Sequence, residues 1–192
     1  ALLFNHVART TSGNNRKVVT TIVCSKLVSK IASNHGVEHA TTLTGFKWII
    51  PAAYNDSSLQ PIFCYEEALG YATNTAVRDK DGISAALMMA ELTAALKEQG
   101  QTLEDELDAL SLEYGHHVTK TWRVRFNSDK SSNVIPKVMQ HLRANPPGTV
   151  NQMKVLAVKD YLLQDNETGL PSTDLIVIKI ENNVRISIRP SG

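Results

Sequence analysis

The stretch IFCYEEALGYA, residues 62–72, decides how the rest of the sequence is interpreted. An apolar run of strand length ends in two adjacent carboxylates, Glu66 and Glu67, and Gly70 follows. In α/β proteins, ligands bind outside the carboxyl ends of the strands, which is where Glu66 would fall. We therefore predict a loop whose carboxylates accept hydrogen bonds from a polyhydroxylated ligand, with Gly70 allowing close approach of the backbone. A hydrated strand end without a ligand is the alternative.

Strands and helices alternate around this stretch. The β-branched runs at residues 18–25 and 37–45 predict two further strands. Helices are predicted over residues 26–36, 46–54, 81–100 and 102–115, with Ser25, Asp79 or Asp81, and Thr102 with Asp105 as capping residues. This alternation favours a three-layer α/β/α domain with a mixed, mostly parallel sheet.

The composition changes near His116, where a polar segment without a sustained apolar face predicts a hinge. A helix follows at residues 132–145, and three strands are predicted at residues 155–163, 175–181 and 184–190. The dipeptide Asn182-Asn183 tolerates positive φ and predicts a tight hairpin between the last two strands. We therefore expect two domains, residues 1–122 and residues 123–192, the second a small α+β domain with antiparallel strands.

Composition excludes several classes of protein. The 192 residues carry a formal net charge of +1 without a block of like charge, which argues against broad nucleic-acid or anionic-membrane binding. No stretch approaches the roughly 20 apolar residues of a membrane span.

Cys24 and Cys64 lie in apolar contexts and predict reduced, buried thiols in a cytoplasmic protein. The sequence opens without methionine, in what reads as the middle of a helix, so we expect a fragment of a longer chain.

Three further motifs, TLTGFKWI, VRDKDGIS and IRPSG, carry groups that bind anions. In TLTGFKWI, residues 42–49, Lys47 would project from a strand-to-helix turn, although an ordinary surface lysine remains the alternative. The terminal IRPSG resembles a phosphate cradle of guanidinium, hydroxyl and backbone amide. No metal-ligand spacing, P-loop, dinucleotide glycine pattern or Ser-His-Asp arrangement is visible, so no metal site and no catalytic residue are predicted. The anion-binding candidates are Lys47, Arg78, Lys80, Arg189, Ser191 and Gly192.

Taken in order, TGFKWI, FCYEEALGYA, VRDKDGISAALMMAEL and IRPSG resemble the C-terminal half of the α-D-phosphohexomutases, the phosphoglucomutase/phosphomannomutase family. The resemblance runs over the whole chain. It implies that residues 1–122 are the third domain of that family, which supplies a sugar-binding loop. It also implies that residues 123–192 are a hinge and most of the fourth domain, which supplies a phosphate-binding loop. The family's phosphorylated serine and its magnesium-binding aspartate loop belong to N-terminal domains that have no counterpart in this sequence.

The resemblance also implies roles for individual residues. Glu66 begins the loop that reads the hydroxyls of the sugar, and Lys47 reaches the bound phosphosugar. Ala68 stands where many relatives have serine, so one hydroxyl contact is missing or replaced. The remaining substrate-binding and phosphate-binding candidates are Gly70, Arg78 and Lys80, and Arg189, Ser191 and Gly192, the last three opening a phosphate loop that this sequence does not complete.

The chemistry implied is interconversion of a sugar 1-phosphate and 6-phosphate through a phosphoserine and a bisphosphorylated hexose, which serves as activator and intermediate. Magnesium would be bound outside these residues, so the fragment alone is expected to be inactive. The expected partners are a phosphosugar and the missing N-terminal domains, and neither nucleic acid nor membrane. A non-catalytic phosphosugar-binding module and a purely structural α/β domain are the alternatives, and the preferred sugar and the oligomeric state are left open.

Overall fold

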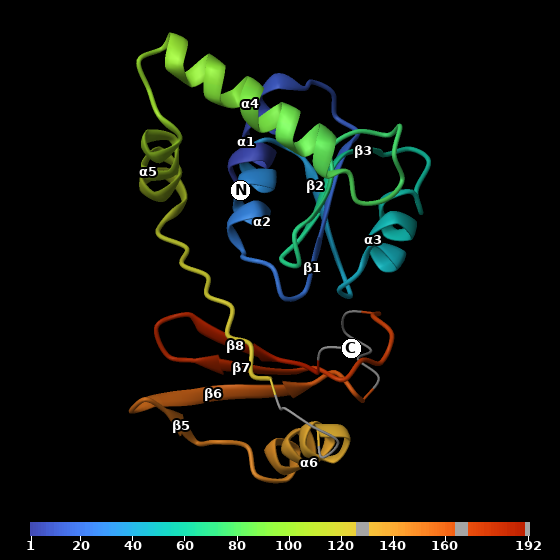
Figure 1. Cartoon of the computed structure of the whole chain (residues 1–192), viewed down its shortest axis with the longest axis vertical. Coiled ribbons are helices and arrows are strands. Elements are labelled where there is room, and N and C mark those ends of the chain that lie inside the picture. Colours follow the sequence, from blue (N-terminus) through green and yellow to red (C-terminus); the bar gives the residue numbers. More distant parts are fainter. Residues whose placement is uncertain (126–130, 164–168, 191–192) are drawn as a thin grey trace. The chain divides into compact units, whose positions relative to one another are not determined.

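The computed structural model describes residues 1–125, 131–163 and 169–190. The chain divides into two compact units, which we call unit 1 (residues 1–120) and unit 2 (residues 121–192), each with a sheet of its own (Figure 1). Over the described ranges, no helix has the length and apolar character needed to cross a membrane.

Unit 1 is built on a four-stranded sheet in the order β2-β1-β3-β4. Strand β1 runs parallel to both β2 and β3, whereas the short β4 runs antiparallel to β3. The predicted mixed, mostly parallel sheet is therefore confirmed. The elements are α1 (Leu2–Thr10), β1 (Arg16–Thr21), α2 (Leu27–Asn34), β2 (Glu38–Thr42), α3 (Phe46–Ala53), β3 (Gln60–Glu66), β4 (Gly70–Ala72), α4 (Gly82–Glu98) and α5 (Leu103–Tyr114).

Helices cover both faces of this sheet (Figure 1). Along β1, Val18 belongs to a core cluster with Phe4 of α1 and Ile31 of α2. Its neighbour Val19 points to the opposite face and belongs to a cluster with Ile49 of α3. Each of these side chains is fully buried, and burial of one such side chain stabilises a fold by roughly 1.5–3 kcal/mol. Side-chain alternation along a buried strand thus produces the predicted three layers.

The helix starts of unit 1 follow the capping residues in the sequence. Asp81 accepts the backbone N–H three residues on at 3.0 Å and begins α4. Thr102 and Asp105 form a reciprocal capping box at the start of α5, as predicted. The start of α2 differs by one position, because Lys26 is the N-cap residue and Ser25 Oγ instead accepts the Leu27 N–H at 3.2 Å.

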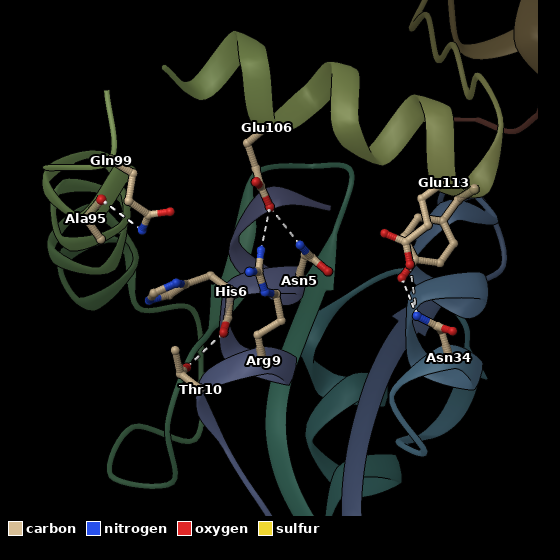
Figure 2. A network of polar contacts seen from close by, with 10 residues as sticks. Asn5, His6, Arg9, Thr10, Asn34, Ala95, Gln99, Glu106 and Glu113 are labelled. Carbon is tan, nitrogen blue, oxygen red and sulfur yellow. Dashed lines mark hydrogen bonds and ion pairs between the residues drawn. The ribbon is translucent and has the colours of Figure 1, made fainter. Parts of the chain in front are cut away.

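Helix α5 is attached to the rest of unit 1 by polar contacts as well as by one buried leucine, Leu110. Figure 2 shows Glu106 pointing at α1, where its Oε1 accepts a hydrogen bond from Asn5 at 2.8 Å and lies 3.5 Å from the Arg9 guanidinium. Further along the helix, Glu113 accepts a hydrogen bond from Asn34 of α2 at 3.0 Å.

Unit 2 is a four-stranded antiparallel sheet in the order β5-β6-β7-β8, packed against one helix. Asn182 and Asn183 both have φ near +59°, which confirms the predicted hairpin between β7 and β8. The predicted strand at residues 155–163 begins and ends earlier, and β5 was not predicted because two residues show no periodicity. The elements are α6 (Ser131–Ala144), β5 (Thr149–Val150), β6 (Met153–Asp160), β7 (Ile176–Ile180) and β8 (Val184–Ile188).

Candidate functional site

The residues predicted to form the site lie at the carboxyl ends of β2 and β3. Both strands run parallel to β1, so they end at the same edge of the sheet. After β2 the chain turns into α3 at Gly45, whose φ of +114° favours glycine. Lys47 follows in the first turn of α3 and is exposed, with its Nζ 5.8 Å from the centre of the Trp48 ring. The sequence prediction that Lys47 projects from a strand-to-helix turn therefore agrees with the structure.

The sugar-binding loop predicted from sequence is a hairpin turn. Glu66 at the end of β3 pairs with Gly70 at the start of β4, so three residues connect the strands. The third of them, Leu69, has φ of +61°, which is the usual conformation at the last position of a three-residue hairpin loop. Ala68 and Leu69 are both exposed and form the tip. Strand β4 was not predicted, because its three residues are too short to show alternation.

Glu66 joins three segments of unit 1. Its side chain is only 2% exposed, its Oε2 accepts the Gly45 N–H at 2.7 Å, and its Oε1 lies 3.2 Å from Lys80 Nζ. A buried carboxylate is costly unless it is paired and hydrogen-bonded, and the amide and the ammonium meet that requirement. The carboxylate thus fixes the turn that carries Lys47 and also holds Lys80, while half of the Lys80 side chain stays exposed.

Phe46 and Gly70 also lie beside Glu66. We call the group formed by Gly45, Phe46, Glu66, Gly70 and Lys80 the junction. Lys80 Nζ lies 4.9 Å from the centre of the Phe46 ring, within the range of a cation–π contact. A Cβ on Gly70 would lie 2.6 Å from Phe46 Cε2 and 3.0 Å from carbon atoms of Glu66 and Lys80. Gly70 is therefore required by close approach of its neighbours and not by a positive φ. Phe46 was not singled out in the sequence, although it stands between Gly45 and Lys47 in the same motif.

The second carboxylate of the motif has a different environment. Glu67 Oε1 accepts a hydrogen bond from the Tyr65 hydroxyl at 2.7 Å and lies 3.4 Å from the Ser25 backbone nitrogen. Burial raises the pKa of Tyr65, so the hydroxyl remains protonated and donates. Glu67 thereby links the hairpin between β3 and β4 to the loop after β1, a contact that the sequence did not predict.

The two cysteines lie close to these strand ends. Cys24 and Cys64 are thiols and not a disulfide, and they are 2% and 3% exposed, as predicted for reduced, buried cysteines. Burial raises the pKa of the Cys64 thiol to about 12, so it stays protonated at neutral pH.

The remaining predicted residues are placed as follows. The Arg78 guanidinium carbon lies 4.4 Å from the centre of the Tyr54 ring, and Arg78 is exposed. Arg189 follows β8 in unit 2 and is exposed, whereas Ser191 and Gly192 lie outside the described residues. The structure of unit 1 therefore brings together the Lys47 turn, Glu66, Gly70 and Lys80.

The magnesium ion that the resemblance implies would be bound outside these residues. In the part of the chain that the structure describes, no group of three or more His, Cys, Asp or Glu side chains could hold a metal ion. The acidic groups of the hairpin between β3 and β4 are committed to protein donors instead: Glu66 to Gly45 and Lys80, and Glu67 to Tyr65.

The sequence of unit 1 matches a known family of protein domains. Residues 1–114 match the family described as "Phosphoglucomutase/phosphomannomutase, alpha/beta/alpha domain III". The match covers more than half of the sequence. This chain belongs to the phosphoglucomutase/phosphomannomutase family, whose members are isomerases.

Individual relatives agree with that assignment. A probable phosphomannomutase of Haemophilus influenzae is 37% identical over 97% of this chain and 36% of its own length. A phosphoglucomutase of Staphylococcus aureus is 30% identical over all of this chain and 37% of its own length. The chain therefore spans about a third of the length of the curated relatives it matches.

Two solved structures share the fold. The phosphoglucomutase parafusin from Paramecium, in its open form, superposes with a TM-score of 0.62 at 19% identity, over all of this chain and 34% of its own. A putative phosphomannomutase from Thermus thermophilus superposes with a TM-score of 0.59 at 18% identity, over all of this chain and 36% of its own.

Proposed function

We propose that unit 1 binds a phosphorylated sugar at the junction around Glu66. The observation that carries this proposal is the Glu66 carboxylate, which joins the turn bearing Lys47 to the side chain of Lys80. Three motifs that were separate in the sequence thus meet at one edge of the sheet. Two ammonium groups and the hairpin tip are the groups that a sugar phosphate requires for charge neutralisation and for hydroxyl contacts.

The site residues divide by chemistry. Lys47 and Lys80 neutralise phosphate, with Arg78 adding positive charge to the same loop as Lys80. Glu66, which is buried, positions Lys80 and the turn before Lys47, and the exposed hairpin tip at Ala68 and Leu69 faces the sugar, where the alanine removes a hydroxyl contact that serine would make. Arg189, Ser191 and Gly192 in unit 2 bind a phosphate group through guanidinium, hydroxyl and amide, in a domain equivalent to the fourth domain of the family.

For the whole protein we propose interconversion of sugar 1-phosphates and 6-phosphates. A phosphoserine transfers its phosphoryl group to a sugar hydroxyl, the bisphosphorylated sugar reorients, and the other phosphoryl group returns to the serine. Such transfers depend on positioning and on neutralised charge, which are the contributions of the cations in this chain. The names of the relatives, phosphoglucomutase and phosphomannomutase, support this reaction class. The magnesium ion of the family would be bound outside these residues.

The test of binding is a titration of the 192-residue chain with glucose 1,6-bisphosphate, followed by amide chemical shifts. Shifts are expected at Gly45, Lys47, Gly70, Lys80 and Arg189. Lys80→Met is expected to raise the Kd about 10-fold or more, because a charge-assisted hydrogen bond contributes about 1.5–3 kcal/mol.

The matched control is Lys97→Met, which removes an ammonium from the last turn of α4 and should leave the Kd unchanged. Shifts outside the named loops, or equal Kd values for the two lysine variants, would show that the site is elsewhere. Turnover of glucose 1-phosphate is expected to be absent for this chain alone, since no phosphoserine loop is found in its sequence. Turnover in a preparation free of contaminating mutase would contradict that expectation.

A further inference from the structure

The loop between β4 and α4, residues 73–81, carries both Arg78 and Lys80 and is exposed over residues 74–80. Its far end is fixed where the Asp81 N–H donates to the Tyr71 carbonyl at 2.7 Å. Among the described residues 75–80, two side chains make polar or ring contacts with residues outside the loop. Arg78 contacts Tyr54, and Lys80 contacts Glu66 and Phe46.

Both side chains contact helix α3. Phe46 is the first residue of this helix and Tyr54 is its C-cap residue. A helix of eight residues is about 12 Å long, so the two rings lie well apart along it. Arg78 and Lys80 are two residues apart in the loop, and their long side chains extend toward opposite ends of the helix. The loop is thus held at two points against one rigid element.

Tyr54 is well placed to act as the second point. Its backbone N–H donates to the Ile50 and Pro51 carbonyls, and its side chain packs against the core cluster under α3. The ring is therefore fixed by the helix end. Arg78 depends on that ring, because an arginine side chain has much rotational freedom and an exposed one is ordered only by its contacts.

We propose that Tyr54 is a positioning residue for the phosphosugar site, which it serves by holding Arg78 and, through the loop, Lys80. Arg78 then contributes mainly as an anchor of the loop and not as a ligand of the phosphate. A lysine that is already ordered loses less conformational entropy when the anion binds, so the anchor raises affinity without touching the ligand. This inference rests on the proposed function, in which Lys80 binds the phosphosugar.

The test compares Tyr54→Leu, which removes the aromatic face, with Tyr54→Phe, which keeps it. The two measurements on the 192-residue chain are the Kd for glucose 1,6-bisphosphate and the ¹⁵N relaxation of the amides at residues 76–80. Tyr54→Leu is expected to raise the Kd about two- to fivefold, which corresponds to an exposed cation–π contact, and to increase the mobility of these amides. Tyr54→Phe is expected to restore both values.

Arg78→Gln provides a second variant at an exposed position, where misfolding is not a concern. It should match Tyr54→Leu in both measurements, and the double variant should be no worse than either single one. Tyr161→Leu is the matched control, because it removes the ring of another cation–π pair, 5.2 Å from Lys159, in unit 2.

The outcomes separate the two proposals. Unchanged Kd and unchanged amide mobility in Tyr54→Leu, or failure of Tyr54→Phe to restore them, overturns the role of Tyr54. Absence of binding by the unmodified chain overturns the proposed phosphosugar site. In that case the relaxation of residues 76–80 in Tyr54→Leu still decides whether Tyr54 orders the loop, since it needs no ligand.

Discussion

At the scale of single residues, Glu66 shows why a carboxylate stands at the end of a buried strand. At this position the carboxylate accepts a hydrogen bond from the backbone N–H of Gly45 and pairs with the ammonium of Lys80. These two partners come from different parts of the sequence. Replacement by glutamine would keep the acceptor for the amide but would remove the charge that pairs with the lysine. The charge of the carboxylate is therefore needed to hold Lys80 beside the Gly45 turn.

Gly70 offers a direct test of this packing. Gly70→Ala places a methyl group against Phe46, Glu66 and Lys80, with the nearest atom at 2.6 Å. We expect a loss of about 1–3 kcal/mol in the free energy of unfolding, which is typical of overpacking, and weaker phosphosugar binding. Urea unfolding measures the first effect.

Gly82→Ala is the matched control for that experiment. Gly82 is the first residue of α4, and a Cβ there would meet no atom within 4 Å. This variant should be neutral or slightly stabilising, because alanine has less freedom in the unfolded chain. Equal stabilities of the two alanine variants would contradict the close packing around Gly70.

At the scale of elements, Arg16 connects two helices to the first strand. It lies at the start of β1 and is buried, and its guanidinium donates to the carbonyls of Ala8 and Thr11 at 2.8 Å each, near the C-terminus of α1. It also donates to the carbonyls of Gly13 and His35, the second of which follows α2. Helix ends leave carbonyls without partners, and one guanidinium provides the donors for several of them.

Arg16→Met should therefore be strongly destabilising. The methionine fills much of the volume but leaves buried carbonyls without donors, and hydrogen bonds to a charged group contribute about 1.5–3 kcal/mol each. We expect a loss of about 3 kcal/mol or more, measured by urea unfolding. Arg9→Met, which breaks only an exposed pair with Glu106, should change the stability by less than about 1 kcal/mol. Similar losses for both variants would refute the role of Arg16.

The caps of α4 and α5 make these two elements sensitive to acid. Hydrogen bonds from Ser84 and from Thr102 lower the pKa of Asp81 and of Asp105 below the ordinary 3.8. The folded state therefore favours the ionised carboxylates, and their contribution to stability is present above pH 3.8 and is lost as the pH falls through the lowered pKa values. Asp105→Asn keeps a capping oxygen without titrating.

Unfolding free energies at about pH 5 and about pH 3 test this dependence. Between these two values, unmodified protein should lose more stability than Asp105→Asn, because the variant has one titrating cap fewer. Parallel losses in both proteins would mean that the Asp105 carboxylate does not contribute in this way.

At the scale of the whole molecule, the sequence predicted what local chemistry determines. The strand alternation, the capping box at Thr102 and the hairpin at Asn182 and Asn183 each depend on residues close together in the chain, and the structure confirms them. The short strands β4 and β5 were not predicted, because two or three residues are too few to show the alternation of side chains that identifies a strand. Helix α2 begins at Leu27, close to the predicted start at residue 26.

The candidate site was predictable only in part for a related reason. Motif order identified the loops that bear Lys47, Glu66 and Lys80. The contact between Glu66 and Lys80 and the close approach of Gly70 to Phe46 depend on how β4 folds back on β3, which no local pattern encodes. The stacking of Arg78 on Tyr54 likewise joins residues that are far apart in the sequence.

The two buried thiols allow transient opening of unit 1 to be measured by chemical modification. Both cysteines of the sequence lie in unit 1, and both are almost fully shielded from solvent. A thiol reagent reacts only with an exposed thiolate, so its rate of reaction with the folded chain reports how often unit 1 opens enough to expose Cys24 or Cys64. Unit 2 contributes nothing to that rate because it contains no cysteine. The opening of unit 1 can therefore be followed by itself, without an engineered probe.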